Sequence, residues 1–282
     1  MDAHTDGEAL AWRPSSTWKW LEADEVHLWR VRHAGDAREL ARYERVLSAG
    51  EQEQASRFRT PRSRDEFVQT RACLRLLLGH YSGMLPASLR FSAGPFGKPA
   101  LADVPLSFNV SHTEGVSMIA ITAHAAAGVD VECVRPSPDL LAIAATHFSR
   151  NELSKLRSLG GAELTESFFR CWTRKEAFLK AQGFGLPHGL DAFEVSLLPH
   201  EHPAVLACTW LPAAQTRWTL AHFEPLPGVL GALAVEQPVR EPVQPVREPA
   251  QPAGEPAEFL RPPFPRIVPL DWSIDLATRF IP

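Results

Sequence analysis

The sequence contains few cysteines, and no two of them form a Cys-x-x-Cys pair. The isolated positions are Cys73, Cys133, Cys171 and Cys208. This pattern argues against a disulfide framework and against a cysteine-based zinc site. The first residues carry neither a basic segment nor an apolar run, so we expect no secretory signal. Reduced, mostly buried thiols fit the cytoplasm, which is where we expect the protein to be.

Long hydrophobic runs and a basic excess are also missing. The most apolar stretch, 116–129, is about 14 residues long and is interrupted by Thr122 and His124, so it is too short to span a bilayer. The 29 Lys and Arg residues face 33 Asp and Glu residues, which gives a formal net charge of −4. A nucleic-acid-binding protein should show a basic surplus instead. With 45% hydrophobic residues, the chain can bury a core. We expect a monomer that binds neither nucleic acid nor membrane.

Proline, in contrast, is abundant, and its distribution divides the chain. Nine of the 25 prolines fall between residues 237 and 265, where a seven-residue unit occurs as QPVREPV, QPVREPA and QPAGEPA. Proline at this frequency forbids a helix or a central strand, so the repeat predicts an extended spacer. The segment 266–282 that follows is apolar enough to dock on something. Either it binds a partner, or it is a frayed tail or folds back on its own domain, which is the alternative we favour.

Before residue 237, strand and helix patterns alternate. Apolar or alternating runs predict strands at 25–33, 89–92, 116–122, 128–133, 193–198, 205–210, 218–223 and 229–235. Helical spacing predicts helices around 67–78, 139–148, 150–159 and 163–182. The order of strand, helices and strands occurs twice, so we expect an α+β fold of two similar halves. The predicted units are 1–125, 126–236, the linker 237–265 and the terminal peptide 266–282.

Two carboxylates lie two residues apart in the predicted strand 128–133. Because alternate residues of a strand point to the same face, Asp130 and Glu132 would lie side by side. Such a pair is costly unless a cation lies between the two groups, and a hard, oxygen-seeking ion such as Mg²⁺ fits there. On this pair alone, a solvated strand face is an equally good interpretation.

The predicted helix 163–182 carries further charged groups. Glu176 and Lys180 lie one turn apart on the flank of its apolar stripe, and Lys175 lies within the stripe. The ordinary interpretations are a surface ion pair for Glu176 with Lys180 and a snorkelling amine for Lys175. A third carboxylate beside two cations would instead suit a metal-bridged, phosphate-bearing substrate.

A strand that ends in polar residues supplies candidate phosphate ligands. The segment FNVSHTEG at 108–115 contains Ser111 and His112. Adjacent side chains diverge, so the two cannot act as nucleophile and base of a serine hydrolase. Upstream, the turn GPFGKP at 94–99 presents Lys98 as a further candidate for phosphate contact.

In this order and spacing, the segments resemble the 4′-phosphopantetheinyl transferases of the Sfp type. The matching motifs are GKP at 97–99, FNVSHTEG at 108–115, GVDVE at 128–132 and WTRKEAFLKAQGFGL at 172–186. The resemblance implies two pseudo-twofold-related α+β halves with the coenzyme A site at their junction. It also implies transfer of the phosphopantetheine arm of coenzyme A to a serine of an acyl- or peptidyl-carrier protein, with release of adenosine 3′,5′-bisphosphate.

The resemblance also assigns roles to the motif residues. Asp130, Glu132 and Glu176 would hold Mg²⁺ on the pyrophosphate. Lys180 would neutralise charge on the leaving phosphate, and Glu176 would be the general base on the carrier serine, so the expected catalytic residues are Glu176, Lys180 and Asp130. The expected coenzyme A contacts are Lys98, Ser111, His112, Lys175 and Lys180, with His112 at the 3′-phosphate.

The nucleotide end departs from the family pattern. Some relatives have lysines for the 3′-phosphate where this chain has Glu51 and Gln54. Nearby arginines offer replacements, or else form a solvated basic face: Arg57, Arg59, Arg62 and Arg64. Of these, we take Arg57 and Arg64 as coenzyme A-binding candidates. Glu152 is a further candidate polar contributor.

Other functions remain open at this stage. The same carboxylates would serve a metal-dependent phosphodiesterase or nucleotidase. A non-catalytic adaptor that acts through its proline-rich tail is a second alternative, against which the complete carboxylate set argues. A separate hypothesis has the tail tether the enzyme to a carrier-bearing assembly through residues 266–280. Deletion of 237–282 would then spare activity on isolated carriers and weaken modification within the assembly.

Overall fold

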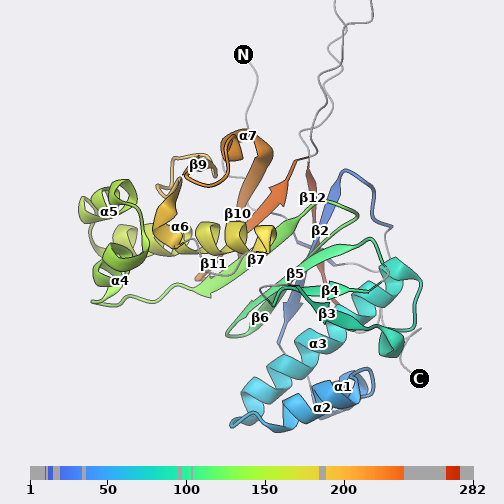
Figure 1. Ribbon diagram of the computed structural model, residues 1–282. Coiled ribbons are helices and arrows are strands. Elements are labelled where there is room, and N and C mark those ends of the chain that lie inside the picture. Colours follow the sequence, from blue (N-terminus) through green and yellow to red (C-terminus); the bar gives the residue numbers. More distant parts are fainter. Residues whose placement is uncertain are drawn as a thin grey trace, which may run out of the picture.

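The computed structural model describes residues 10, 12–14, 20–33, 36–94, 97–102, 104–183, 189–237 and 265–273. It shows a mixed α+β fold, which confirms the predicted class, with two groups of helices and strands lying side by side (Figure 1). Residues 238–264 with nearly all of the repeat, the end of the long motif at 184–186 and the tail beyond residue 273 lie outside the described residues.

A five-stranded sheet forms the core of the first half. Its strand order is β1-β12-β2-β6-β5, with bounds Arg13–Pro14, Arg266–Asp271, Glu25–Arg32, Val116–Thr122 and Ser107–Thr113. Every residue of β6 is buried. This explains why that strand is a continuous apolar run in the sequence. A small hairpin, β3 (Phe91–Ala93) with β4 (Pro99–Leu101), precedes β5.

The described residues of this half form the helices α1 (Ala37–Glu44), α2 (Ala49–Ser56) and α3 (Pro61–Ser82), followed by a short 3₁₀ helix, Pro86–Ser88. α3 begins where the Thr60 side chain accepts a hydrogen bond from the Ser63 amide and a proline occupies the first turn. It ends at Gly83, whose φ of 71° suits a left-handed C-cap. Its apolar residues, such as Leu77, share a core with Trp29 of β2.

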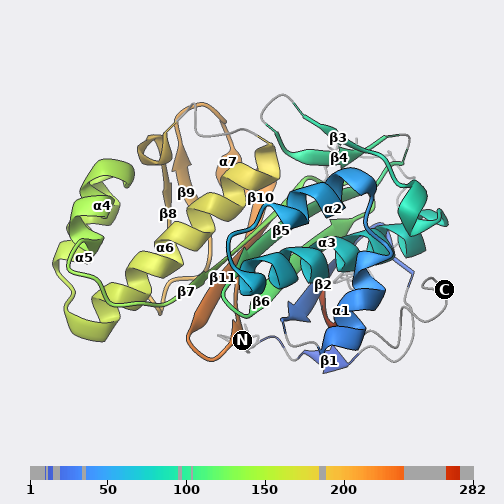
Figure 2. The ribbon, with the colours of Figure 1, turned by 90° about the horizontal axis from the view of Figure 1, so that it is seen from below.

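The second half is built on a three-stranded antiparallel sheet. Its order is β10-β11-β7, with bounds Trp218–Leu226, Val229–Glu236 and Ala127–Cys133. The long helix α6 (Gly161–Gln182) packs on this sheet, and Figure 2 shows α3 and α6 each crossing the sheet of its own half. The smaller elements are α4 (Leu140–His147), α5 (Arg150–Arg157), a 3₁₀ turn (Leu190–Ala192), β8 (Phe193–Val195), β9 (Val205–Cys208) and α7 (Ala214–Arg217).

The two sheets share an apolar interface. Val26 and Met118 of the first sheet pack with Val129 and Leu233 of the second. Burial of this surface from both sides joins the halves into one body. The chain crosses from the first sheet to the second between residues 122 and 127.

Within the second half, the backbones of α6 and β7 lie very close together at Gly128. A Cβ atom at this position would lie 2.1 Å from the Ala177 carbonyl oxygen and 2.3 Å from the Ala181 nitrogen. Only glycine fits this close backbone approach. The glycine of the GVDVE motif thereby sets the spacing that brings Glu176 and Lys180 over the strand.

We expect Gly128→Ala to lower the free energy of unfolding by about 1–3 kcal/mol or more, because the added methyl group must displace helix backbone. Gly50→Ala is the matched control, since a Cβ there meets nothing within 4 Å and alanine favours a helix. Denaturant unfolding of the two variants measures the difference. Equal stability of both would contradict the close contact.

The C-terminal segment is part of the first sheet. β12 lies between β1 and β2 and runs parallel to both. Of the alternatives for 266–282, folding back on the same domain therefore holds for residues 266–271. Pairing in this sheet competes with any contact of residues 266–271 with a separate assembly, while residues 274–280 of the tether hypothesis lie outside the described residues. Deletion of 237–282 would remove a strand from the sheet.

Candidate active site

Three of the predicted motifs meet at Asp130 on β7. The Oδ1 atom of Asp130 accepts a hydrogen bond from Ser111 Oγ on β5 at 2.9 Å and lies 2.5 Å from Lys180 Nζ on α6. Lys180 also donates to Ser111 Oγ at 3.2 Å. Asp130 is only 3% exposed, whereas the Lys180 side chain is 31% exposed. A carboxylate held at the junction of the halves thus orients an accessible ammonium group.

Negative charge is crowded around this point. Burial, and then the neighbouring Asp130, raise the pKa of Glu132 to about 7 and also raise the pKa of Glu176. The Oδ2 atom of Asp130 is buried and has no hydrogen-bond partner within the described chain. An unpaired oxygen among three carboxylates fits a hard divalent cation such as Mg²⁺. Even so, no three His, Cys, Asp or Glu side chains of the described residues form a metal-ligand group.

Lys175 lies away from this cluster. It is fully buried, with its Nζ 2.8 Å from Glu152 Oε2, and it donates to the carbonyl oxygens of Leu190 and Phe193. Its ammonium group has no N–H left for a phosphate, which corrects the predicted phosphate contact and the snorkelling alternative. Glu152, 2% exposed, also accepts from the Val195 amide. The predicted polar contributor Glu152 is thus a buried structural partner.

Lys98 connects the two halves. From the turn between β3 and β4, its Nζ donates to the carbonyl oxygens of Ala127 at 2.9 Å and Ala181 at 3.0 Å. Burial lowers the pKa of this amine to about 8. The lysine therefore fastens the first half to β7 and to the end of α6, beside the expected coenzyme A site.

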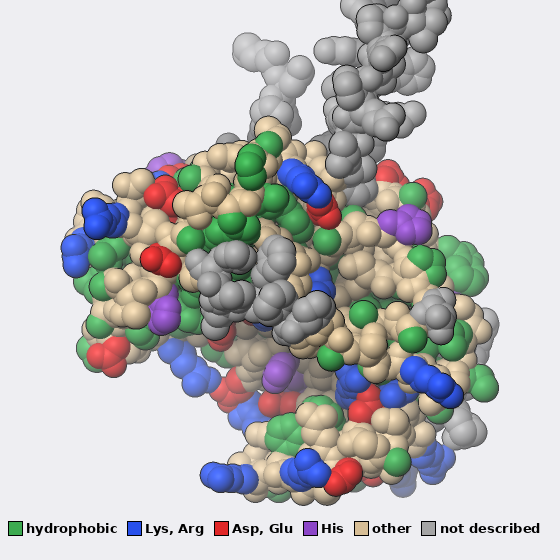
Figure 3. Space-filling model, in the orientation of Figure 1, with side chains coloured by type: hydrophobic (Ala, Val, Ile, Leu, Met, Phe, Trp, Pro, Cys, Tyr) green, Lys and Arg blue, Asp and Glu red, His purple; other side chains and the backbone are tan. Residues whose placement is uncertain are grey.

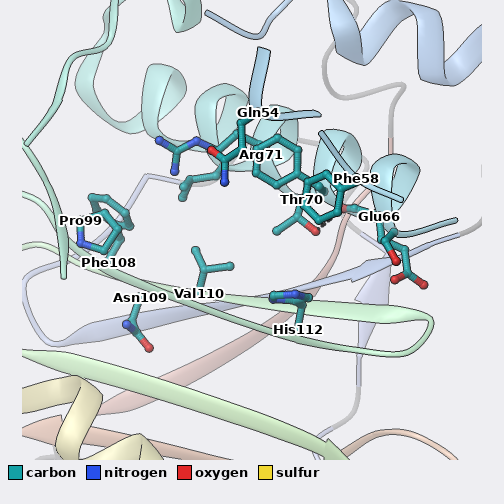
Figure 4. Close-up of a pocket in the computed structure, with 13 residues that line it drawn as sticks. Gln54, Phe58, Glu66, Thr70, Arg71, Pro99, Phe108, Asn109, Val110 and His112 are labelled. Carbon is teal, nitrogen blue, oxygen red and sulfur yellow. Dashed lines mark hydrogen bonds between the residues drawn. The ribbon is translucent and has the colours of Figure 1, made fainter. Parts of the chain in front are cut away.

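A cavity of about 580 Å³ lies between the helices of the first half and β5. Its lining residues are Gln54, Phe58, Ser63, Glu66, Phe67, Thr70, Arg71, Leu74, Pro99, Phe108, Asn109, Val110 and His112. Figure 4 shows Val110 and His112 on the strand side, facing Gln54, Arg71 and Thr70 on the helix side. On the surface, acidic, basic and histidine side chains gather in a hollow between the halves (Figure 3).

Arg71 is a candidate that sequence reasoning missed. It is bonded to Glu51 through Nε, and its guanidinium carbon lies 4.1 Å from the centroid of the Phe91 ring. The signal is present in the sequence. Phe67, Arg71 and Leu74, which follow the helical spacing of four and three residues, line one face of α3 toward the cavity.

The arginines that we predicted as substitutes lie elsewhere. Arg57 is exposed and pairs with Glu53 at 2.6 Å, while Arg64 pairs with Glu44 and Asp65. Neither lines the cavity. Their interpretation as solvated surface charges therefore agrees better with the structure. Glu51, where some relatives have lysine, binds Arg71 instead.

His33 supports the cavity wall from behind. Its Nε2 lies 2.8 Å from Ser117 Oγ and 3.2 Å from the Oγ1 of Thr70, a cavity-lining residue. Burial lowers the pKa of this imidazole from 6.5 to about 4, despite the opposing effect of Glu66. The folded state therefore holds His33 neutral at neutral pH.

This shift predicts a pH dependence of stability. Between pH 6.5 and about 4, the unfolded chain protonates His33 and the folded chain does not, so the stabilisation is present above pH 6.5 and is lost as the pH falls. His33→Gln should reduce the slope of the free energy of unfolding against pH by up to about 1.4 kcal/mol per pH unit in this range. Urea unfolding across this range measures the slope. The exposed His202→Gln should leave the slope unchanged, and an unchanged slope in His33→Gln would contradict the account.

Known proteins resemble this chain over most of its length. A family model described as the 4′-phosphopantetheinyl transferase superfamily matches residues 126–235. The chain is 36% identical over 228 residues to the 4′-phosphopantetheinyl transferase HetI of Nostoc sp., which covers 79% of this chain and 93% of that protein. It is 30% identical over 208 residues to the transferase Sfp of Bacillus subtilis, with 69% and 90% covered.

These relatives, matched over two thirds or more of both chains, identify the class of this protein as phosphopantetheinyl transferase. The chain belongs to the 4′-phosphopantetheinyl transferase family. Within the described residues, no helix is both long and apolar enough to cross a bilayer.

Proposed function

We propose that this transferase moves the phosphopantetheine arm of coenzyme A to a serine of an acyl- or peptidyl-carrier protein, that it requires Mg²⁺, and that it releases adenosine 3′,5′-bisphosphate. The observation that carries the proposal is the joint contact of Asp130, Ser111 and Lys180 beside two carboxylates of raised pKa. The carboxylates can bind a metal ion, and the ammonium group of Lys180 beside them can bind a phosphate.

Asp130, Glu132 and Glu176 would hold the magnesium ion. When bound, Mg²⁺ supplies positive charge that stabilises the pyrophosphate as its negative charge grows. The unpaired Oδ2 of Asp130 is the first ligand that the structure offers. Its Oδ1 remains engaged by Ser111 and Lys180, so one carboxylate serves both purposes.

Two side chains of this protein would accept the serine proton and neutralise the negative charge on the leaving group. The bond that forms joins the carrier serine oxygen to the phosphorus of the arm, and the bond that breaks is the pyrophosphate P–O bond. Glu176, whose pKa burial raises, is suited to accept the serine proton. The ammonium group of Lys180, fixed by Asp130, neutralises charge on the departing phosphate.

We assign the nucleotide end of coenzyme A to the cavity between α3 and β5. Its volume of about 580 Å³ lies in the range of small-molecule sites. His112 and Arg71 supply donors on opposite walls (Figure 4). Lys98 holds the neighbouring turn against β7, and we propose that it also contacts coenzyme A near this cavity. The units 1–125, 126–236 and 237–265, a monomeric state and a cytoplasmic location likewise remain proposals.

Arg71→Gln should raise KM for coenzyme A by about tenfold or more, because a hydrogen bond to a charged group is lost. Arg57→Gln, at the exposed pair with Glu53, is the matched control and should leave KM unchanged. Steady-state kinetics with varied coenzyme A measures both. An unchanged KM in Arg71→Gln would remove the cavity assignment.

Analysis of the nucleotide products separates transfer from hydrolysis. With coenzyme A, Mg²⁺ and a carrier domain, adenosine 3′,5′-bisphosphate should appear in equal amount to modified carrier. A carrier whose acceptor serine is replaced by alanine should release none. Release without the acceptor serine would favour the phosphodiesterase alternative.

A further inference from the structure

The C-terminal strand occupies an edge of the transferase body that would otherwise be open. β12 pairs with β2 over six residues, from Arg266 opposite Glu25 to Asp271 opposite Arg30. Residues 238–264 separate it from the end of the described second half. Without β12, the backbone groups on that side of β2 would face solvent, which is the arrangement that accepts an added strand.

The proline of β12 is compatible with this position. The amides of Arg266 and Trp272 donate to the carbonyl oxygens of Asp24 and Arg30, each at 2.9 Å. Because strand amides alternate in direction, even-numbered residues point to β2 and Pro269 points to the opposite side. On that side, the described residues of β1 pair with the two residues after the proline. The missing N–H of Pro269 therefore leaves the β2 ladder intact.

Three consecutive side chains give the docking its specificity. Leu270 is 2% exposed within the first core. The Asp271 carboxylate accepts two hydrogen bonds from Arg30, from Nε and a terminal nitrogen, each at 2.6 Å. The indole N–H of Trp272 donates to Tyr43 Oη at 2.9 Å. The buried leucine, the bidentate ion pair and the directed hydrogen bond together make the docking specific for the sequence Leu270-Asp271-Trp272.

Arg30 extends this contact into the second half. Its remaining terminal nitrogen donates to the Pro225 carbonyl oxygen of β10 at 2.6 Å, and its guanidinium carbon lies 4.7 Å from the centroid of the Trp12 ring. The arginine is 6% exposed. A buried cation of this kind is costly without its counter-ion, so Asp271 completes a junction between the two sheets.

We propose that residues 265–273 form a sequence-specific peptide ligand of the transferase's own body, bound in cis along the edge of β2 by recognition of Leu270, Asp271 and Trp272. The covalent connection makes docking intramolecular. A free peptide must therefore compete against a high local concentration of the tail, and cutting the connection removes that advantage.

The test uses the full chain with a protease site inserted between Val243 and Gln244, and a fluorescent peptide of residues 265–273. After cleavage, the C-terminal fragment should stay with the body on gel filtration. The labelled peptide should displace it at a concentration about 100-fold or more below that needed with the uncut protein. A peptide with Asp271→Ala should bind at least about tenfold more weakly, and a scrambled peptide should not bind.

Several outcomes would overturn the proposal. These are separation of the cut fragment without peptide binding, equal binding of the scrambled peptide, and equal binding to cut and uncut protein. A dimer of uncut protein that cutting converts to a monomer would assign the strand to a second copy, against docking in cis. All of these readouts measure binding alone, so they are independent of the proposed transfer reaction.

Discussion

Glu176→Gln should lower kcat/KM for transfer to a carrier protein by about 10³-fold or more, since general-base catalysis alone contributes roughly 10²–10⁴. Glutamine keeps the size of the side chain but cannot accept the serine proton, and it weakens the magnesium site. The raised pKa of Glu176, which burial causes, places the proton affinity of the carboxylate closer to neutral pH. Single-turnover transfer to a carrier domain measures the loss.

The matched control is Glu166→Gln on the same helix. The Glu166 side chain is 55% exposed and lies 4.0 Å from Arg170, so its replacement should leave transfer unchanged. Neither variant should unfold at a lower denaturant concentration than the parent, which separates a loss of chemistry from a loss of folding. Near-parental activity of Glu176→Gln would contradict its assigned role.

Lys175→Met should lower the free energy of unfolding by about 3–5 kcal/mol, because it leaves an uncompensated buried charge. Lys175 is 0% and Glu152 2% exposed, and Nζ lies 2.8 Å from Oε2. The carbonyl oxygens of Leu190 and Phe193 also lose their donor. Equilibrium unfolding in guanidinium measures the change.

The double variant Lys175→Met with Glu152→Gln should recover part of that loss, since the unpaired charge is then absent. Lys155→Met breaks the ion pair with Glu201, in which the lysine side chain is 35% exposed. It should cost no more than about 1 kcal/mol. If Lys175→Met were as mild as Lys155→Met, the buried pair would not stabilise the fold as described.

Elements of both halves were predictable where they are strongly apolar or long. The strand predicted at 116–122 is β6, and the helix predicted at 163–182 is α6, which begins two residues earlier. The short helices α1 and α2 were missed because their sequences are polar. A capping box at Ser48 and Glu51 marks the start of α2, so a local signal existed.

The missed strand β12 has no comparable local signal. It contains a proline, and its partner strand lies more than 200 residues earlier in the chain. Local patterns cannot specify such a pairing, because long-range contacts decide it. The sequence could therefore predict that the terminal segment docks, but it could not predict the strand with which the segment pairs.

The candidate site divides in the same way. Motif spacing and family resemblance brought together Ser111, Asp130 and Lys180, and the structure places them in contact. Lys175 was misassigned because helical periodicity shows that a residue faces inward, but not which partners it meets there. Arg71 was overlooked for a related reason, since a cavity between α3 and β5 depends on how distant elements pack.

The most direct test of the central claim is the intact mass of carrier domains after incubation with the purified full-length protein, coenzyme A and Mg²⁺. The account predicts that at least one acyl- or peptidyl-carrier domain gains the mass of a single phosphopantetheine arm on its acceptor serine, and that chelation of the metal abolishes the gain. No mass gain across a broad carrier panel, with coenzyme A either intact or hydrolysed, would contradict it.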